Sequence, residues 1–101
     1  KDAVAWAKKA VELMPQAVQF HDTLGWVHRA QGRLDEAASV LERASTMNPA
    51  ATDILYHLGI VYSEQDRAVE AREAFEKALA LNERFSNAQD AKARLQALRR
   101  S

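Results

Sequence analysis

The 34-residue period of this sequence restricts the chain to folds in which one module stacks on a copy of itself. Residues recur at this interval in register: Leu24-Gly25 with Leu58-Gly59, Ala37 with Ala71, Ala44 with Ala78, and further upstream Pro49 with Pro15. A module of this length cannot bury its apolar face alone, so neighbouring copies must pack together. The period therefore limits which functions are possible as well as which folds.

Within each module, apolar residues follow the spacing of one helical face. In the first half we expect helices from Lys1 to Met14, from about Val18 to Gln31 and from about Asp35 to Met47. In the second half we expect helices from Thr52 to the Asp66-Arg67 turn, from that turn to the break near Glu83, and from Ser86 to about Arg100. The 48% apolar fraction and the scarcity of Gly and Pro fit an all-α domain. The sequence therefore predicts antiparallel helix pairs.

Two kinds of turn signal separate the predicted helices. Gly32-Arg33 ends one helix, where a glycine can take the left-handed conformation that closes the last turn. Asp66-Arg67 replaces it as the tight turn at the equivalent position. Ser86 followed by Gln89 has the form of a capping box for the last helix. The turn chemistry therefore agrees with the helix boundaries drawn from the apolar pattern.

Gly25 and Gly59 lie inside predicted helices, where glycine costs about 1 kcal/mol relative to alanine. Close approach of the paired helix would compensate for that cost. We expect the small facing surface to come from the repeated alanines of the second helices: Ala37, Ala44, Ala71 and Ala78. On this interpretation both glycines are packing residues.

These residues resemble the tetratricopeptide repeat (TPR). One full copy is matched by Leu55, Leu58, Gly59, Tyr62, Ala71, Phe75 and Ala78, and a second by His21, Leu24, Gly25, His28, Gly32, Ala37, Leu41, Ala44 and Pro49. The departures are His21 and His28 at positions that are usually aromatic, and Glu83 in place of a proline. The Asp22–Trp26 segment is also similar to repeats of large bacterial scaffolding and export proteins.

The resemblance implies an all-α, right-handed superhelix of antiparallel helix pairs in a single domain. We divide this domain into the second helix of a partial repeat (1–17), two repeats (18–51 and 52–85) and a capping helix (86–101). The capping role follows from the narrow apolar stripe and polar remainder of the last helix. Val4, Ala7 and Val11 on the first helix lack the preceding helix that they would normally contact, so we expect an uncapped apolar face there.

Several other functions are not favoured by the residues present. Fourteen basic and fourteen acidic residues cancel, and Arg94, Arg99 and Arg100 are not interleaved with aromatic residues, so nucleic-acid binding is not expected. No apolar run is long enough for a membrane span, and the first residues do not have the form of a signal peptide. Both cytoplasm and periplasm remain open.

Catalytic and metal chemistry lack the necessary residue groups. The absence of cysteine excludes disulfides, thiolate zinc sites and cysteine nucleophiles. His21 and His28 lie seven residues apart, about 10 Å along a helix, which is too far for one ion without another ligand. We interpret these histidines as packing residues, and we expect no enzyme activity, no metal and no cofactor.

A concave groove is the remaining candidate site, because the first helix of each TPR pair lines the concave side of the superhelix. The resemblance places ten residues there: Asp22, Trp26, Arg29, Asp53, Tyr56, His57, Ile60, Ser63, Asp90 and Arg94. Trp26 would be the main apolar anchor. Alternatively, it packs on the neighbouring helix near Tyr56 or Ile60. Because the groove lacks the lysines that clamp a terminal carboxylate, a peptide or amphipathic helix carrying an apolar anchor and a basic residue fits it better.

The expected function is a protein-interaction module in a larger scaffold, assembly or export-related protein. Its partner would be another protein, with no role for nucleic acid or membrane insertion. The alternative is self-association, in which the uncapped face of Val4, Ala7 and Val11, together with Trp6, pairs with a second copy.

Overall fold

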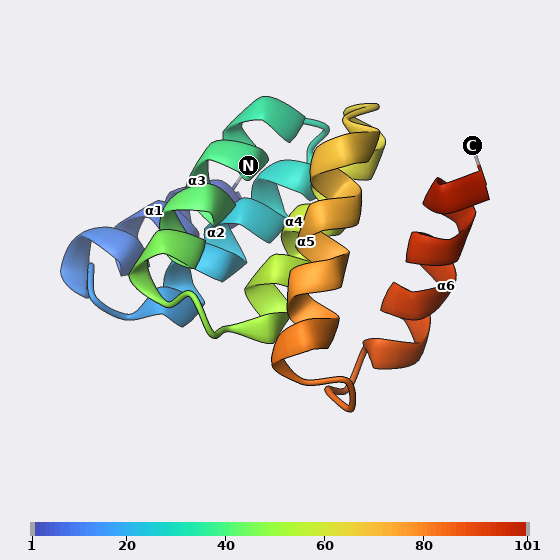
Figure 1. Cartoon of the computed structure of the whole chain (residues 1–101). Coiled ribbons are helices and arrows are strands. Elements are labelled where there is room, and N and C mark those ends of the chain that lie inside the picture. The colour runs from blue at the N-terminus through green and yellow to red at the C-terminus, as the bar shows by residue number, and fades with distance from the viewer. Residues whose placement is uncertain (1, 101) are drawn as a thin grey trace. The chain divides into compact units, whose positions relative to one another are not determined.

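The computed structural model describes residues 2–100, with the side chain of Asp2 left aside. Its secondary structure consists of the following α-helices: α1 (Asp2–Leu13), α2 (Val18–Ala30), α3 (Leu34–Met47), α4 (Thr52–Glu64), α5 (Ala68–Leu81) and α6 (Ala88–Arg100) (Figure 1). The all-α prediction is confirmed. α6 begins two residues after the predicted cap Ser86, because residues 86 and 87 form a turn.

The chain divides into two compact units, Lys1–Pro49 and Ala50–Ser101, and each is described by itself. In the first, α2 packs against both α1 and α3. Val4, Ala7 and Leu24 form a buried cluster across α1 and α2, with Val11, Val27 and Val40 packed against it. This unit therefore has a core shared by its three helices.

In the second unit, α5 packs against both α4 and α6. Phe75 of α5 and Val61 of α4 are fully buried, and Ala91 and Leu95 supply the buried side of α6. Phe85, in the loop before α6, is also buried, and its ring lies edge-on to Tyr56 with the centroids 5.9 Å apart. The last helix is therefore attached through its apolar stripe and through the loop that precedes it.

The turns that end α2 and α4 have the same geometry. Gly32 has φ +78°, the left-handed conformation predicted for it, and Asp66, which was predicted only to form a tight turn, has φ +60° and adopts the same conformation. The N–H of Arg33 donates to the His28 carbonyl oxygen at 2.9 Å, and Gly32 N–H donates to that of Arg29 at 2.9 Å. This pair of bonds is a Schellman motif, and the corresponding pair after α4 repeats it.

Gly25 and Gly59 allow close packing between paired helices, but the residues that face them are not the predicted alanines. A Cβ atom at Gly25 would lie 2.6 Å from Leu41 Cγ, and one at Gly59 would lie 2.6 Å from Phe75 Cε1. The prediction that alanines lie opposite the two glycines is therefore wrong. The missing Cβ makes room for a large side chain from the second helix, and the four alanines are themselves fully buried.

The position of the apolar face on α1 also differs from the prediction. Val4 and Ala7 are buried against Leu24 of α2, so they do not form an uncapped face. The exposed apolar side chains are instead Trp6 and Leu13, which are 59% and 70% exposed, followed by Met14 just after the helix. The prediction was wrong because the helix that follows α1 covers its Val4 stripe.

Candidate functional site

The ten predicted groove residues lie on three helices. α2, in the first unit, carries Asp22, Trp26 and Arg29. The others belong to the second unit, on α4 and α6: Asp53, Tyr56, His57, Ile60, Ser63, Asp90 and Arg94. Some of them occupy equivalent positions in consecutive repeats, since Asp22, Tyr56 and Asp90 are separated by 34 residues.

Tyr56, Asp90 and Arg94 form a hydrogen-bonded cluster between α4 and α6. The Tyr56 hydroxyl donates to Asp90 Oδ2, and Arg94 Nε donates to the same oxygen at 2.6 Å. The Tyr56 ring is buried, whereas the side chains of Asp90 and Arg94 are 47% and 43% exposed. The structure therefore brings these three predicted residues together at the surface of the second unit.

The electrostatics of this cluster follow from its shared carboxylate. The hydrogen bond from Tyr56, followed by that from Arg94, lowers the pKa of Asp90 below the ordinary 3.8. Burial and then the hydrogen bond to Asp90 raise the pKa of Tyr56. Asp90 therefore stays ionised at neutral pH, and its charge is already compensated by Arg94 within the unit.

The remaining predicted residues of α4 differ in accessibility. Ile60 is only 3% exposed, so its side chain contributes little accessible surface. The Ser63 hydroxyl donates to the Gly59 carbonyl oxygen at 2.9 Å within the helix. His57 is half-buried, with its ring centroid 5.7 Å from that of Tyr56. Asp53 is exposed in the first turn of α4 and is the acid that the groove prediction places on this helix.

On α2, Trp26 and Arg29 contact each other. The Arg29 guanidinium lies 4.5 Å from the centroid of the Trp26 ring, which is the geometry of a cation–π contact. Both side chains are half-buried, as is Asp22. The indole therefore presents part of its surface to solvent, with a cation stacked on one face.

The two histidines of α2 are buried, as expected of packing residues. His21 is 5% exposed and its Nε2 lies 2.9 Å from the Pro15 carbonyl oxygen, which accepts a hydrogen bond from the Nε2-protonated tautomer. His28 is 4% exposed, and its Nδ1 has no hydrogen-bond partner among residues 2–100. Burial lowers the pKa of His28 below 6.5, Glu36 opposes that shift, and Lys8 and Arg33 add to it.

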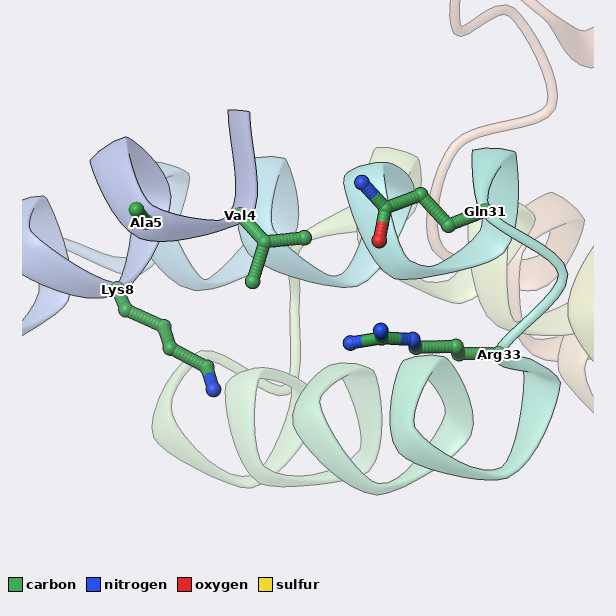
Figure 2. Close-up of a pocket in the computed structure, with 5 residues that line it drawn as sticks. All are labelled: Val4, Ala5, Lys8, Gln31 and Arg33. Atoms are coloured by element: carbon green, nitrogen blue, oxygen red, sulfur yellow. The ribbon is translucent and has the colours of Figure 1, made fainter. Parts of the chain in front are cut away.

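Two surface features were missed by the sequence reasoning. Around Trp6 is an apolar pocket of about 200 Å³, lined by Trp6, Lys9, Ala10, Leu13, Met14 and Phe20. A second pocket, where α1 meets the turn after α2, is lined by Val4, Ala5, Lys8, Gln31 and Arg33 (Figure 2). Aligning Lys8 with Glu42, 34 residues later, would have shown that the charge at this position is inverted between copies.

Residues 2–100 contain no group of three or more His, Asp or Glu side chains placed to hold a metal ion. None of the helices described is long and apolar enough to cross a membrane.

Comparison with known proteins identifies the repeat. The family model described as "Tetratricopeptide repeat" matches residues 28–95. A search of curated protein sequences gives no match. The all-α, TPR-like fold is shown both by this model and by solved structures.

The solved structures have low sequence identity and high structural similarity. The Yersinia enterocolitica type III secretion translocator chaperone SycD is 18% identical over 97% of this chain and 70% of that chain, with a TM-score of 0.90, and it has also been solved with a peptide of the translocator YopD. The first TPR of Spaghetti (RPAP3), bound to the HSP90 peptide SRMEEVD, is 15% identical over 96% of this chain and 75% of that chain, with a TM-score of 0.88.

A third solved structure is somewhat closer in sequence. YrrB, described as a TPR protein with an unusual peptide-binding site, is 26% identical over 90% of this chain, with a TM-score of 0.82. The match covers 47% of YrrB.

Proposed function

Because the chain belongs to the tetratricopeptide repeat family, we propose that it is a non-catalytic protein-interaction module that binds a peptide or an amphipathic helix of a partner protein. Within each unit, the surface proposed for this partner consists of the predicted groove residues that the unit carries. Solved proteins of similar fold support the proposal, because SycD, the Spaghetti TPR and YrrB are each described with a bound peptide or a peptide-binding site.

The contact between Tyr56 and Asp90 is the observation on which the proposal mainly rests. These residues occupy equivalent positions in consecutive modules, and in the second unit the hydroxyl of one donates to the carboxylate of the other. The groove prediction requires such equivalent positions to lie on one side of the repeat. The contact supports that requirement for α4 and α6.

The accessible charges define the chemistry expected of the partner. Asp90 is already compensated by Arg94, whereas Asp53 is exposed and has no ion pair with any residue that the structure describes. A basic side chain of the partner would therefore interact with Asp53, and an apolar side chain with the exposed part of Trp26. The similarity to a type III secretion chaperone makes an export-related or scaffolding assembly the context that we favour.

Selection of peptide binders followed by charge reversal tests this proposal. A phage library of amphipathic helical peptides is selected against the wild-type chain, and the binders are measured by isothermal titration calorimetry. Trp26→Ala and Asp53→Lys should each weaken binding about tenfold or more, as expected of contact residues. Glu73→Lys, at an exposed position of α5, is the matched control and should leave affinity unchanged. Binders that tolerate both groove variants would contradict the proposal.

Self-association is a second candidate, and the exposed apolar side chains around Trp6 favour it. Trp6, Leu13 and Met14 are each more than half exposed, and the Trp6 and Phe20 rings meet edge-to-face at 6.5 Å. Clustered apolar groups of this kind mark interaction surfaces more often than scattered ones do. A second copy of the chain would cover them in a two-fold dimer.

Light scattering across a dilution series separates the two candidates. A self-associating chain changes from dimer to monomer on dilution, and Leu13→Glu should shift this midpoint to higher concentration. Val69→Glu changes an exposed apolar residue on α5 and serves as the control. A monomer at every concentration would exclude the second candidate and leave the peptide-binding proposal untouched.

A further inference from the structure

The pocket of Figure 2 collects two cations at one place in the first unit. It has a volume of about 470 Å³ and is lined by Val4, Ala5 and Lys8 of α1 and by Gln31 and Arg33 of the turn between α2 and α3. The Arg33 side chain extends in the direction of Lys8, and in this view Val4 lies between the guanidinium and the ammonium group, which line the same pocket (Figure 2). Val4 supplies an apolar wall, since its side chain is only 8% exposed.

Neither cation is neutralised within the described structure. Lys8 and Arg33 make no ion pair and no side-chain hydrogen bond with residues 2–100, and the Gln31 amide makes none either. Two like charges that converge repel each other, and an anion placed between them relieves that repulsion. The pocket therefore has donors and positive charge available to an external ligand.

The buried His28 ring is within electrostatic range of both cations. Its Nδ1 has no hydrogen-bond partner among the described residues; burial is the main cause that lowers its pKa, and the charges of Lys8 and Arg33 lower it further. Glu36 is the acid that opposes them there. The His28 ring can therefore report a change in the charge around Lys8 and Arg33.

The equivalent arginine in the second unit shows what Arg33 lacks. Arg67 lies 4.4 Å from the Tyr62 ring centroid, and it bonds Glu70 and Gln65 at 3.3 Å each. Arg33 has none of these restraints, although Glu36 and Gln31 occupy the corresponding sequence positions. The Arg33 guanidinium therefore keeps its donors for another acceptor.

We propose that Lys8, Gln31 and Arg33 form a binding subsite for an oxyanion, either a carboxylate of an acidic polypeptide segment or a phosphate group. The guanidinium offers two parallel N–H donors to the oxygens, the ammonium adds a point charge, and the Gln31 amide donates a further hydrogen bond. This subsite is separate from the residues of the proposed groove. It does not depend on the peptide-binding proposal, because a free anion can occupy it.

NMR titration of the isotopically labelled full chain tests the subsite at constant ionic strength. The two probes are inorganic phosphate and acetylated tetraglutamate, and the readouts are the Arg33 Nε–H resonance and the pKa of the His28 ring. We expect saturable shifts at Arg33 and a rise in the His28 pKa as the bound anion offsets both cations. His21 serves as the internal reference, because its ring bonds Pro15 instead.

Substitutions distinguish a built site from general charge screening. Lys8→Ala and Arg33→Ala should each weaken binding about tenfold, the loss typical of one charge-assisted hydrogen bond. Lys9→Ala removes the neighbouring lysine, which lines the other pocket, and should leave affinity unchanged. Lys8→Gln repeats the test with the side-chain length kept, and circular dichroism verifies folding of each variant.

The outcomes separate clearly. Saturable binding of either probe that depends on Lys8 and Arg33 supports the subsite, and the tighter probe identifies the source of the oxyanion. Linear shifts without saturation overturn the proposal. Equal affinities in the Lys8, Arg33 and Lys9 variants overturn it as well, since the binding would then be unspecific.

Discussion

Replacing Gly59 with alanine tests how closely α4 and α5 pack. Helix propensity alone predicts that this change stabilises the chain by about 1 kcal/mol, because glycine is unfavourable inside a helix. The packing predicts the opposite sign. A Cβ atom at this position would lie 2.6 Å from Cε1, 2.7 Å from Cζ and 2.8 Å from Cδ1 of Phe75. The substitution therefore sets one known effect against the other.

The structure gives the size of the packing term. The Phe75 ring would have to retreat by about 0.8 Å, the difference between 2.6 Å and the 3.4 Å at which ordinary contact begins. This ring is fully buried and packs against Tyr56, with the centroids 6.1 Å apart, so it has little room to move. Overpacking of this kind costs typically 1–3 kcal/mol. Because the ring has little room to move, its cost lies in the upper part of that range, about 2–3 kcal/mol. Subtracting the propensity gain of about 1 kcal/mol leaves a net loss of about 1–2 kcal/mol, or roughly 5–15 °C in Tm.

Urea and thermal unfolding followed by circular dichroism measure this loss. Both tryptophans, Trp6 and Trp26, lie in the first unit, so their fluorescence reports that unit and separates its transition from that of the second. Ala93→Gly, at an exposed position inside α6, calibrates the propensity cost in this chain and should destabilise by about 1 kcal/mol.

A double substitution identifies Phe75 as the cause. Phe75→Ala removes the Cδ1, Cε1 and Cζ atoms that the new methyl group would meet. In that background Gly59→Ala should therefore cost clearly less than it does in the wild type. If Gly59→Ala stabilises the wild-type chain, or if its cost is the same in both backgrounds, the account of close packing is wrong.

Three further predictions concern turns and titrating groups. Gly32→Ala should lower the free energy of unfolding by about 1 kcal/mol, and Asp66→Gly should raise it by about 0.5 kcal/mol, since both positions have positive φ; urea midpoints that move in the same direction would contradict this. Tyr56→Phe should destabilise the chain at neutral pH. Its difference from wild type in the free energy of unfolding should shrink as pH falls below about 4, because Asp90, a carboxyl group with a lowered pKa, stabilises the fold only while it is ionised. If urea unfolding shows a difference that is constant with pH, this mechanism is excluded. The wild type should lose stability as pH falls below 6.5, because burial lowers the pKa of His28 and the unfolded chain binds the proton first; the same urea series on His28→Tyr should lack this loss, and an unchanged slope would refute it.

The helices and the turns between them could be predicted from sequence because their causes are local. The 34-residue period and the apolar spacing place each helix within a few residues of its observed bounds. The left-handed turn at Gly32 follows from the lack of a Cβ atom, and Asp66 could be assigned to the same role because it occupies the equivalent position. Short-range patterns therefore determine most of this fold.

Packing partners were predicted less well, because a periodic pattern gives the face of a helix but not the residue opposite it. The glycines were expected to face alanines, yet Leu41 and Phe75 fill the space. Val4 was expected to be uncovered on α1, yet α2 buries it. Both errors concern which side chain reaches across an interface, which depends on helix rotation.

The candidate site was predictable only in part. The pairing of Tyr56 with Asp90 follows from their 34-residue separation and could have been stated in advance. The stacking of Arg29 on Trp26 and the convergence of Lys8 on Arg33 depend on side-chain rotamers, which no periodicity encodes. The ten groove positions stay a prediction, and so does the division into repeats.

The attachment of α6 has a consequence for how the chain could be divided. This helix follows an exposed loop segment at residues 82–84, and it is held by apolar contact with α5 and by the bond from Tyr56 to Asp90. If a protease cleaved that loop, the terminal segment would become a separate ligand of the remaining chain. Its retention would then depend on concentration, so that a synthetic peptide of the same sequence could compete for its place and report the strength of the attachment directly.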